Sequence, residues 1–224
     1  MPARAALVAA PSPLWRVERP SENIRFSQIN PVDALNDRAG NRFDVPGAGV
    51  LYAATRREGA LAETLAGFRP RAQVNDTLEM LGVTAGRVLA GQVPSVWFDV
   101  RRMVRLTVDE ALPFVDIEDP ATHTALTVLA SDVLGRLGIG NLDVATVRGP
   151  SRLLTRAVAS WVYSQVDEHG HALYAGIRYV SRLGDFECWA IFEGTPVSRR
   201  GVEPITARDA DVRSVMDLFG ITLA

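Results

Sequence analysis

The chain has 224 residues, 47 % of them hydrophobic and 22 % charged, and its formal net charge is −2. This composition is typical of a globular domain that is long enough to bury a core, and it excludes a disordered or fibrous chain. The slightly acidic balance argues against direct binding of nucleic acid, and the absence of an apolar run of about 20 residues argues against a membrane span. The single cysteine, Cys188, excludes an internal disulfide, and we expect it to be a buried apolar residue in a reducing cytoplasm.

In chain order, residues 1–13 are predicted to be a loose N-terminal arm and residues 14–224 a single domain. Strand patterns, either alternating or continuously apolar, occur in six places. They are residues 14–18, 50–55, 96–108, 113–118, 176–182 and 187–192. Between the first two lies a polar stretch, residues 21–49, that predicts a long ordered loop of the kind that often carries function.

Apolar residues at helical spacing predict four helices. They are residues 57–68, 120–137, 152–165 and 206–219. Strands and helices follow one another without a regular β-α-β alternation, so the sequence predicts an α+β fold.

Several sequence motifs that indicate a particular chemistry are absent. No Gly-x-Gly-x-x-Gly follows a predicted strand, and the chain contains no P-loop, His-Glu-x-x-His or Gly-x-Ser-x-Gly motif. His169 and His171 have no third ligand nearby, so we expect solvated loop residues and no metal site, and we expect His123 on a helix surface.

Three polar residues in the first third of the chain could hold a ligand. Arg42 lies between two glycine-bearing turns, Tyr52 lies on a predicted strand, and Glu63 lies on the helix face opposite to its apolar stripe. A guanidinium can clamp a pyrophosphate, and a carboxylate can stabilise an oxocarbenium ion or bind a ribose hydroxyl. Taken singly, each residue also has a structural explanation, as a loop stabiliser, a core aromatic and a solvated helix residue. Helical spacing surrounds Glu63 with small residues, which are Gly59, Ala62, Ala66 and Gly67.

These residues stand in segments that resemble the RES domain, a family named for an arginine, a glutamate and a serine. The similar segments agree with the family in order and spacing, and they are residues 14–17, 40–47, 50–55, 58–64, 176–182 and 188–192. The resemblance spans residues 14–193, and within it residues 70–150 contain no segment that we match. It implies a mixed central sheet with flanking helices, similar to the fold of ADP-ribosyltransferase toxins.

The resemblance also implies a role for each matching residue. Arg42 would hold a pyrophosphate or an incoming phosphate, and Glu63 would bind ribose hydroxyls and stabilise an oxocarbenium-like transition state, so these two are the predicted catalytic residues. Tyr52 would pack beside the nicotinamide or its ribose, and Ser181 would hydrogen-bond that ribose or a phosphate. Arg16 matches a recurrent arginine near the first strand and is a further candidate for binding.

The implied activity is that of a toxin from a toxin–antitoxin system that consumes NAD⁺. The nicotinamide–ribose bond would be cleaved by phosphorolysis, with inorganic phosphate as co-substrate, or by hydrolysis, in both cases without a metal ion. Two alternatives stay open, namely transfer of ADP-ribose to a protein and a non-catalytic module that binds the antitoxin. The implied partner is a helix-turn-helix-type antitoxin, and exposed sheet edges would be consistent with a homodimer.

Overall fold

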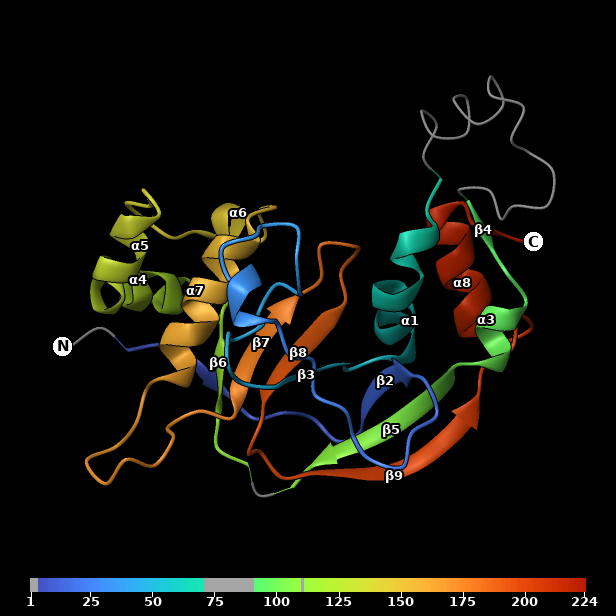
Figure 1. The fold of residues 1–224 in the computed structure, drawn as a ribbon, viewed down its shortest axis with the longest axis horizontal. Coiled ribbons are helices and arrows are strands. Elements are labelled where there is room, and N and C mark those ends of the chain that lie inside the picture. The colour runs from blue at the N-terminus through green and yellow to red at the C-terminus, as the bar shows by residue number, and fades with distance from the viewer. Residues whose placement is uncertain (1–3, 71–90, 110) are drawn as a thin grey trace.

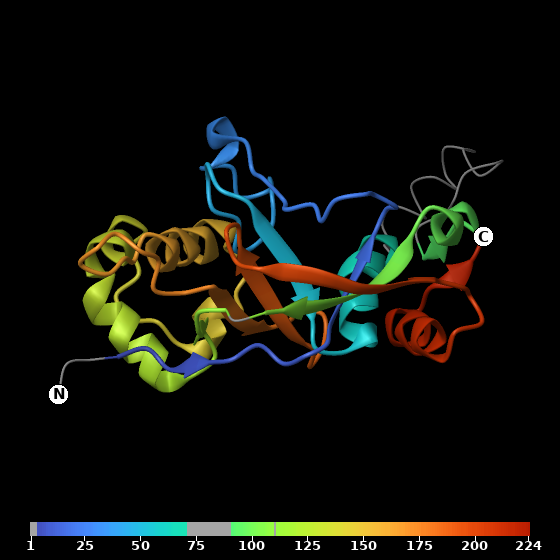
Figure 2. The same cartoon turned by 90° about the horizontal axis from the view of Figure 1, so that it is seen from below.

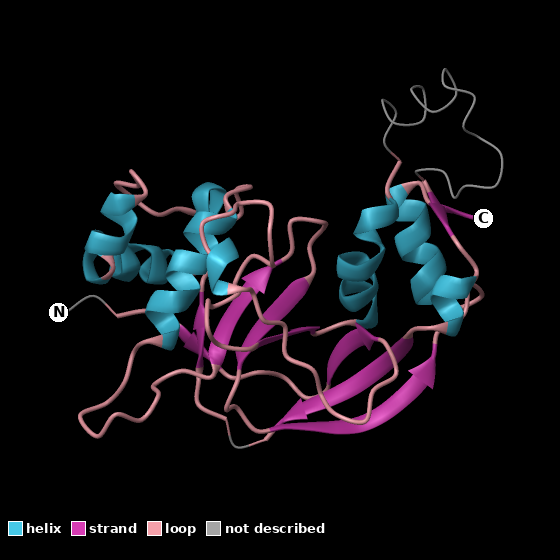
Figure 3. Ribbon diagram, viewed as in Figure 1, coloured by secondary structure: helices cyan, strands magenta, loops and turns pink. Residues whose placement is uncertain are grey.

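The computed structural model describes residues 4–70, 91–109 and 111–224, and it is an α+β protein built around one large mixed sheet (Figure 1, Figure 3). In this part of the chain, eight strands form the sheet. Their spatial order is β1 (Leu7–Val8), β6 (Phe114–Asp116), β7 (Gly176–Val180), β8 (Glu187–Phe192), β3 (Val50–Ala54), β2 (Leu14–Glu18), β5 (Arg102–Val108) and β9 (Val197–Pro204). Strands β6 and β7 are parallel, and the other neighbours are antiparallel. A separate parallel pair is formed by β4 (Gln92–Val93) and β10 (Thr222–Leu223).

The helices stand in two groups at opposite ends of the sheet (Figure 1, Figure 2). One group lies beside β6 and β7 and contains α4 (Pro120–Leu129), α5 (Ser131–Arg136), α6 (Val144–Val147) and α7 (Arg152–Tyr163). The other lies beside β2, β5 and β9 and contains α1 (Arg57–Leu65), α3 (Val96–Asp99) and α8 (Ala210–Phe219). Two 3-10 turns complete the helical elements, η1 (Pro31–Asp33) and η2 (Ala66–Phe68).

Local signals in the sequence set the ends of these helices. Asp119 caps α4 by accepting a hydrogen bond from the Ala121 amide at 2.7 Å, directly before a proline at the first helical position. Ser151 caps α7 in the same way through the Leu154 amide. Gly220 ends α8 with a left-handed backbone (φ +63°), a conformation that glycine adopts at little cost.

The sheet is split between β2 and β3. Strand β2 forms five residue pairs with β5, and β3 forms five with β8, but β2 and β3 share the single pair Trp15–Ala54. The two strands therefore part at one end, and the sheet consists of two halves joined by a narrow contact. Residues of both strands line a cavity where the halves separate, which makes this a suitable place for a ligand.

Both faces of the central strands are buried. On β3, Val50 and Ala54 belong to the larger core beneath the helices, whereas Leu51 and Ala53 belong to a smaller core on the opposite face. The smaller core is covered by partly buried residues from the N-terminal segment and nearby loops, including Val8, Ala10, Ile24 and Phe26. This double burial explains why β3 is a continuous apolar run and does not alternate.

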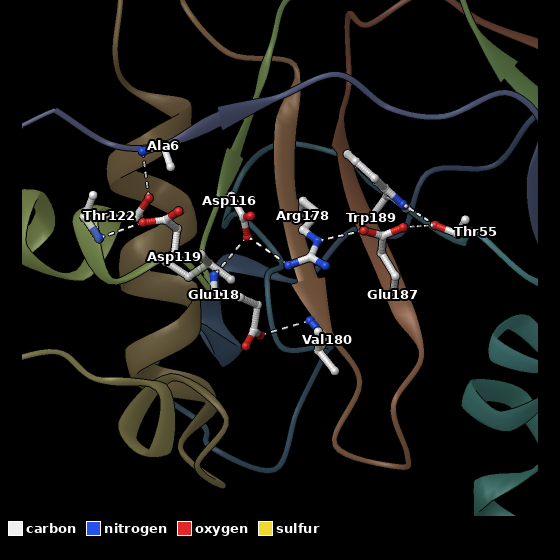
Figure 4. A network of polar contacts seen from close by, with 12 residues as sticks. Ala6, Thr55, Asp116, Glu118, Asp119, Thr122, Arg178, Val180, Glu187 and Trp189 are labelled. Carbon is white, nitrogen blue, oxygen red and sulfur yellow. Dashed lines mark hydrogen bonds and ion pairs between the residues drawn. The ribbon is translucent and has the colours of Figure 1, made fainter.

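A polar network ties β6, β7 and β8 to the segment between β3 and α1 (Figure 4). Arg178 on β7 forms ion pairs with Asp116 on β6 (3.1 Å) and with Glu187 on β8 (2.9 Å). The other oxygen of Glu187 accepts a hydrogen bond from the hydroxyl of Thr55. The oxygen of that hydroxyl accepts a hydrogen bond from the indole N–H of Trp189 at 3.0 Å. Thr55 follows β3 and lies two residues before α1, so the network ties the start of the connection to α1 to β8.

The predicted α+β class is confirmed, but three predicted elements are wrong in part. Of the strand predicted over residues 96–108, the first four residues form helix α3, because a short apolar run is ambiguous between helix and strand. The helix predicted over 120–137 is interrupted at Ala130 (ψ 22°) and forms α4 and α5. The arm expected to be loose carries β1, whose Leu7 and Val8 pair with Val115 and Phe114. Strand β9 was not predicted, because its edge position leaves it polar and exposed.

Candidate functional site

A cavity of about 760 Å³, which we call the cleft, opens where the sheet splits. It is lined by β2, β3, the loop that precedes β3, α1, the first residue of α7 and the turn that follows β7. The volume is in the range of small-molecule and cofactor sites. The described charged residues of its lining are five arginines and one carboxylate, namely Arg16, Arg42, Arg69, Arg152, Arg182 and Glu63. The cleft is therefore strongly cationic and suited to an anionic ligand.

Arg42 reaches the cleft from the loop before β3. Its Nη2 donates to the main-chain oxygen of Val147 at 2.6 Å, and its guanidinium carbon lies 5.2 Å from the ring centre of Phe43 and 5.7 Å from that of Tyr179. Its Nε and Nη1 are buried and have no hydrogen-bond partner in the described part of the chain. Burial accordingly lowers the pKa of Arg42 from its ordinary value. A buried cation with unfilled donors favours an anion that could complete its hydrogen bonds.

Asp44 shapes the turn that carries Arg42. This carboxylate is buried, accepts the Asn41 amide at 2.6 Å, and accepts the hydroxyl of Tyr52 at 2.8 Å. The same hydroxyl accepts the amide of Phe43 at 3.1 Å. We did not predict Asp44, although an Asn-x-x-Asp pattern beside a glycine is a recognisable turn signal.

Tyr52 is one of the residues that line the cleft. Its hydroxyl is already engaged by Asp44 and Phe43, so the contact available to a ligand is the ring and not the hydroxyl.

Glu63 and Ser181 come together from distant parts of the sequence. Ser181 donates its hydroxyl proton to Glu63 Oε1 at 2.6 Å, and its Oγ accepts the amide of Leu183 at 3.0 Å. Arg69 holds the same turn by donating to the main-chain oxygen of Leu183 at 3.3 Å. Ser181 is buried, whereas Glu63 is exposed toward the cleft. The amide of Leu183 fixes the direction of the hydroxyl, and the hydroxyl in turn fixes one oxygen of Glu63. The other oxygen has no partner among the described residues and could contact a ligand.

The small residues around Glu63 are arranged differently from the helical-wheel prediction. Ala66 lines the cleft, together with Ala60 and Thr64. Gly59 and Ala62 are buried in the core instead, and a Cβ on Gly59 would lie 2.9 Å from the Cβ of Ala54. The reason is that α1 packs on α8 as well as on β2 and β3, so only a narrow strip of the helix faces the cleft.

Arg16 is placed as an anchor at the edge of the split. Its Nη1 donates to the main-chain oxygen of Tyr52 at 3.0 Å, and its Nη2 donates to that of Arg25 at 3.3 Å. Its Nε lies 3.5 Å from Glu18, which also pairs with Arg199 at 2.6 Å. Arg16 therefore joins β2 to β3 where the strands part, and only its remaining N–H groups could reach a ligand.

Helix α7 clamps the loop that carries Arg42. Arg156 is fully buried, and its guanidinium donates only to main-chain oxygens, which belong to Asp33 (3.2 Å), Ala34 (2.9 Å), Asn36 (2.7 Å) and Arg152 (3.2 Å). Asp37 accepts the first amides of α7 from Arg152 at 2.6 Å and Leu153 at 3.2 Å. The clamp explains how a loop of this length can hold Arg42 in one place.

Comparison with known protein families identifies the family of this chain. The sequence model of the RES domain matches residues 13–213. The chain belongs to the RES-domain family. Membership confirms the family expected from the short segments and extends it over residues 70–150, where we had matched none. A search among curated proteins returns no match. Membership of this family indicates a module related to toxin–antitoxin systems and to NAD.

The histidines and the cysteine of the RES domain lie outside the cleft. His123 is buried and its Nε2 lies 2.7 Å from the main-chain oxygen of Ile117, so the predicted surface position is wrong. His169 and His171 are exposed beside Asp167, and the described residues contain no group of three or more side chains suited to a metal ion. Cys188 is buried, as predicted. None of the helices in the described ranges is long and apolar enough to cross a membrane.

We expect the RES domain to lose stability as the pH rises above about 8.5, where an unfolded cysteine ionises. Burial raises the pKa of Cys188, Tyr179 and Tyr52, and Asp44 raises the pKa of Tyr52 further. These groups stay protonated in the folded state but ionise when unfolded, so their stabilisation is complete below the unfolded pKa values and is lost above them. Each contributes a slope of up to about 1.4 kcal/mol per pH unit in that window. Urea midpoints measured between pH 7.5 and 10.5 should fall, and a midpoint that stays constant would contradict this expectation.

Proposed function

We propose that this RES domain cleaves the nicotinamide–ribose bond of NAD⁺. One observation carries the proposal: Glu63, oriented by Ser181 at 2.6 Å, faces the same cleft as Arg42, whose Nε and Nη1 are unfilled. A carboxylate and a guanidinium across one cavity are complementary to a ligand that carries both a positive centre and phosphates. NAD⁺ has this character, with a cationic nicotinamide ring and a pyrophosphate.

Arg42 would hold a phosphoryl group of NAD⁺ or of the acceptor. A guanidinium binds phosphate oxygens in a bidentate manner, and here Val147, Phe43 and Tyr179 already limit its rotation. The ring of Tyr52 would pack against the nicotinamide or its ribose, while Arg16 would support the strand edge on which the ligand rests. Positioning of this kind lowers the barrier because the reacting groups lose little further freedom in the transition state.

Glu63 would act on the ribose. When the glycosidic bond breaks, its electron pair moves onto the ring nitrogen and nicotinamide leaves as a neutral molecule, so no strong acid is required. Positive charge then grows on the ribose as an oxocarbenium ion. A fixed carboxylate beside that carbon stabilises the charge more in the transition state than in the ground state, which is the condition for faster chemistry. Ser181 contributes by keeping Glu63 in one rotamer.

The acceptor completes the reaction at the ribose carbon. Inorganic phosphate would give nicotinamide and ADP-ribose phosphate, and water would give nicotinamide, ADP-ribose and a proton. The chemistry needs no metal ion. We further propose that the RES domain acts in the cytoplasm and that its partner is a helix-turn-helix-type antitoxin, in keeping with the relation of the family to toxin–antitoxin systems.

The proposal is tested by incubating the purified protein with NAD⁺, with and without inorganic phosphate, and separating the products by chromatography. We expect release of nicotinamide in at least one condition. Formation of ADP-ribose phosphate only with phosphate present identifies a phosphorylase, and formation of ADP-ribose in both conditions identifies a hydrolase. Absence of nicotinamide in both conditions would overturn the proposed soluble acceptors, and a mass increase on a protein substrate would then identify ADP-ribosyl transfer.

A further inference from the structure

Arg182 is a cationic residue of the cleft that has no role in the proposed function and was not among the residues matched to the family. It directly follows Ser181 and is exposed at the cleft. Its guanidinium has no hydrogen bond or ion pair to any residue in the described ranges. The other arginines of the lining differ, because Arg16, Arg69 and Arg152 each donate to main-chain oxygens that hold the fold together.

Arg182 and Arg42 both line the cleft. Tyr179 lines the same cavity, and its ring centre lies 5.7 Å from the guanidinium carbon of Arg42. The positive charge of Arg182 lowers the pKa of Arg42 in addition to the effect of burial. The only carboxylate in the described lining, Glu63, is engaged by Ser181 through one of its two oxygens. Two guanidiniums thus line one cavity, one with buried unfilled donors and one without a partner among the described residues, and a single carboxylate cannot neutralise both.

This arrangement is unfavourable without an anion. Like charges repel, and the two buried nitrogens of Arg42 lack the hydrogen bonds that they would have in water. A phosphoryl group has several oxygens and up to two negative charges, so it can accept from both guanidiniums at once. A carboxylate ligand would fill fewer donors, and a neutral ligand would leave the repulsion in place.

We propose that Arg182 and Arg42 together form a phosphoryl-binding site next to the Glu63–Ser181 pair. The inference rests on the proposed function for its place in the reaction, because the bound group is either the pyrophosphate of NAD⁺ or free phosphate as acceptor. Arg42 supplies the fixed, buried half of the site, and Arg182 supplies the exposed half that closes on the group. Arg182 is therefore a binding residue of the reaction.

The first arm of the test is binding of inorganic phosphate to the full chain, measured by calorimetry at constant ionic strength and without NAD⁺. We expect R182Q to bind phosphate about 10- to 100-fold more weakly than the wild type, as is typical for loss of a charge-assisted hydrogen-bond pair. The phosphate affinity of R182K should lie between those of R182Q and the wild type, because lysine keeps the positive charge but cannot donate two parallel hydrogen bonds as a guanidinium does. The matched control is R136Q, which removes an exposed arginine on α5 that lies outside the cleft lining.

The second arm assigns the source of the group. If the site holds the acceptor, R182Q raises the KM for phosphate and leaves the KM for NAD⁺ near its wild-type value; if it holds the pyrophosphate, the KM for NAD⁺ rises instead. Either result supports the site. R182Q with wild-type phosphate affinity and both KM values unchanged overturns it. A wild type that binds phosphate through Arg182 but releases no nicotinamide would instead overturn the proposed function, so the two failures are distinguishable.

Discussion

Replacing Glu63 by glutamine should lower kcat for NAD⁺ cleavage by about 10²- to 10³-fold, the usual cost of removing one preorganised electrostatic contact to a transition state. Glutamine keeps an oxygen that can accept the hydroxyl of Ser181, so the geometry is conserved and only the charge is lost. The urea midpoint should stay close to that of the wild type, because Glu63 is exposed and its removal uncovers no core residue. The KM for NAD⁺ should change far less than kcat, since the stabilised charge exists only in the transition state.

The matched control is E58Q, which removes a carboxylate from the first turn of the same helix, outside the cleft lining. Its kcat should equal that of the wild type. The kcat of S181A should lie between those of E63Q and the wild type, because this substitution removes the hydroxyl that orients Glu63 and leaves the charge of Glu63 in place. An E63Q enzyme with wild-type turnover would contradict the role that we assign to this carboxylate.

Replacing Arg156 by methionine should destabilise the fold by about 3 kcal/mol, because several buried carbonyls lose their donors at once. The side chain donates to four main-chain oxygens, three of them in the loop of residues 33–36. Methionine fills similar space but cannot donate, so the loss is one of hydrogen bonds more than of packing. The effect is measured as a fall in the free energy of unfolding in urea.

The same variant should also lower kcat/KM, since the clamped loop leads directly to Arg42. We expect this loss to remain when the assay is run well below the unfolding midpoint, where the variant is fully folded. The control is R213M on α8, whose side chain is exposed and forms no hydrogen bond or ion pair to the described residues; it should leave both stability and activity unchanged. A wild-type urea midpoint for R156M would contradict the clamp.

Much of the fold could be predicted from local patterns. The strands around Leu14, Val50 and Glu187 and the helices around Glu63 and Trp161 follow their periodicities, because each buries a continuous apolar face or run. Elements whose shape depends on their neighbours were mispredicted or missed. Residues 96–99 form a helix although their apolar run also suits a strand, and β9 pairs with β5 at an edge where exposed polar residues hide the strand pattern.

The sequence by itself determined the residue types of the candidate site. Arg42, Tyr52, Glu63 and Ser181 could be named because they stand in segments that match a family in order and spacing, and all but the buried Ser181 line the cleft. Their chemistry, one carboxylate with guanidiniums, was also predictable from the sequence.

Only the tertiary structure decided how these residues interact. The hydrogen bond between Ser181 and Glu63 joins positions 118 residues apart, and the clamp of Arg156 on residues 33–36 spans a similar distance, so no local pattern contains either contact. The burial of Asp44 and His123 and the unfilled donors of Arg42 likewise depend on which elements pack around them. The physical reason is that periodicity reports the face that an element buries, whereas the partner of a polar group is fixed by long-range packing.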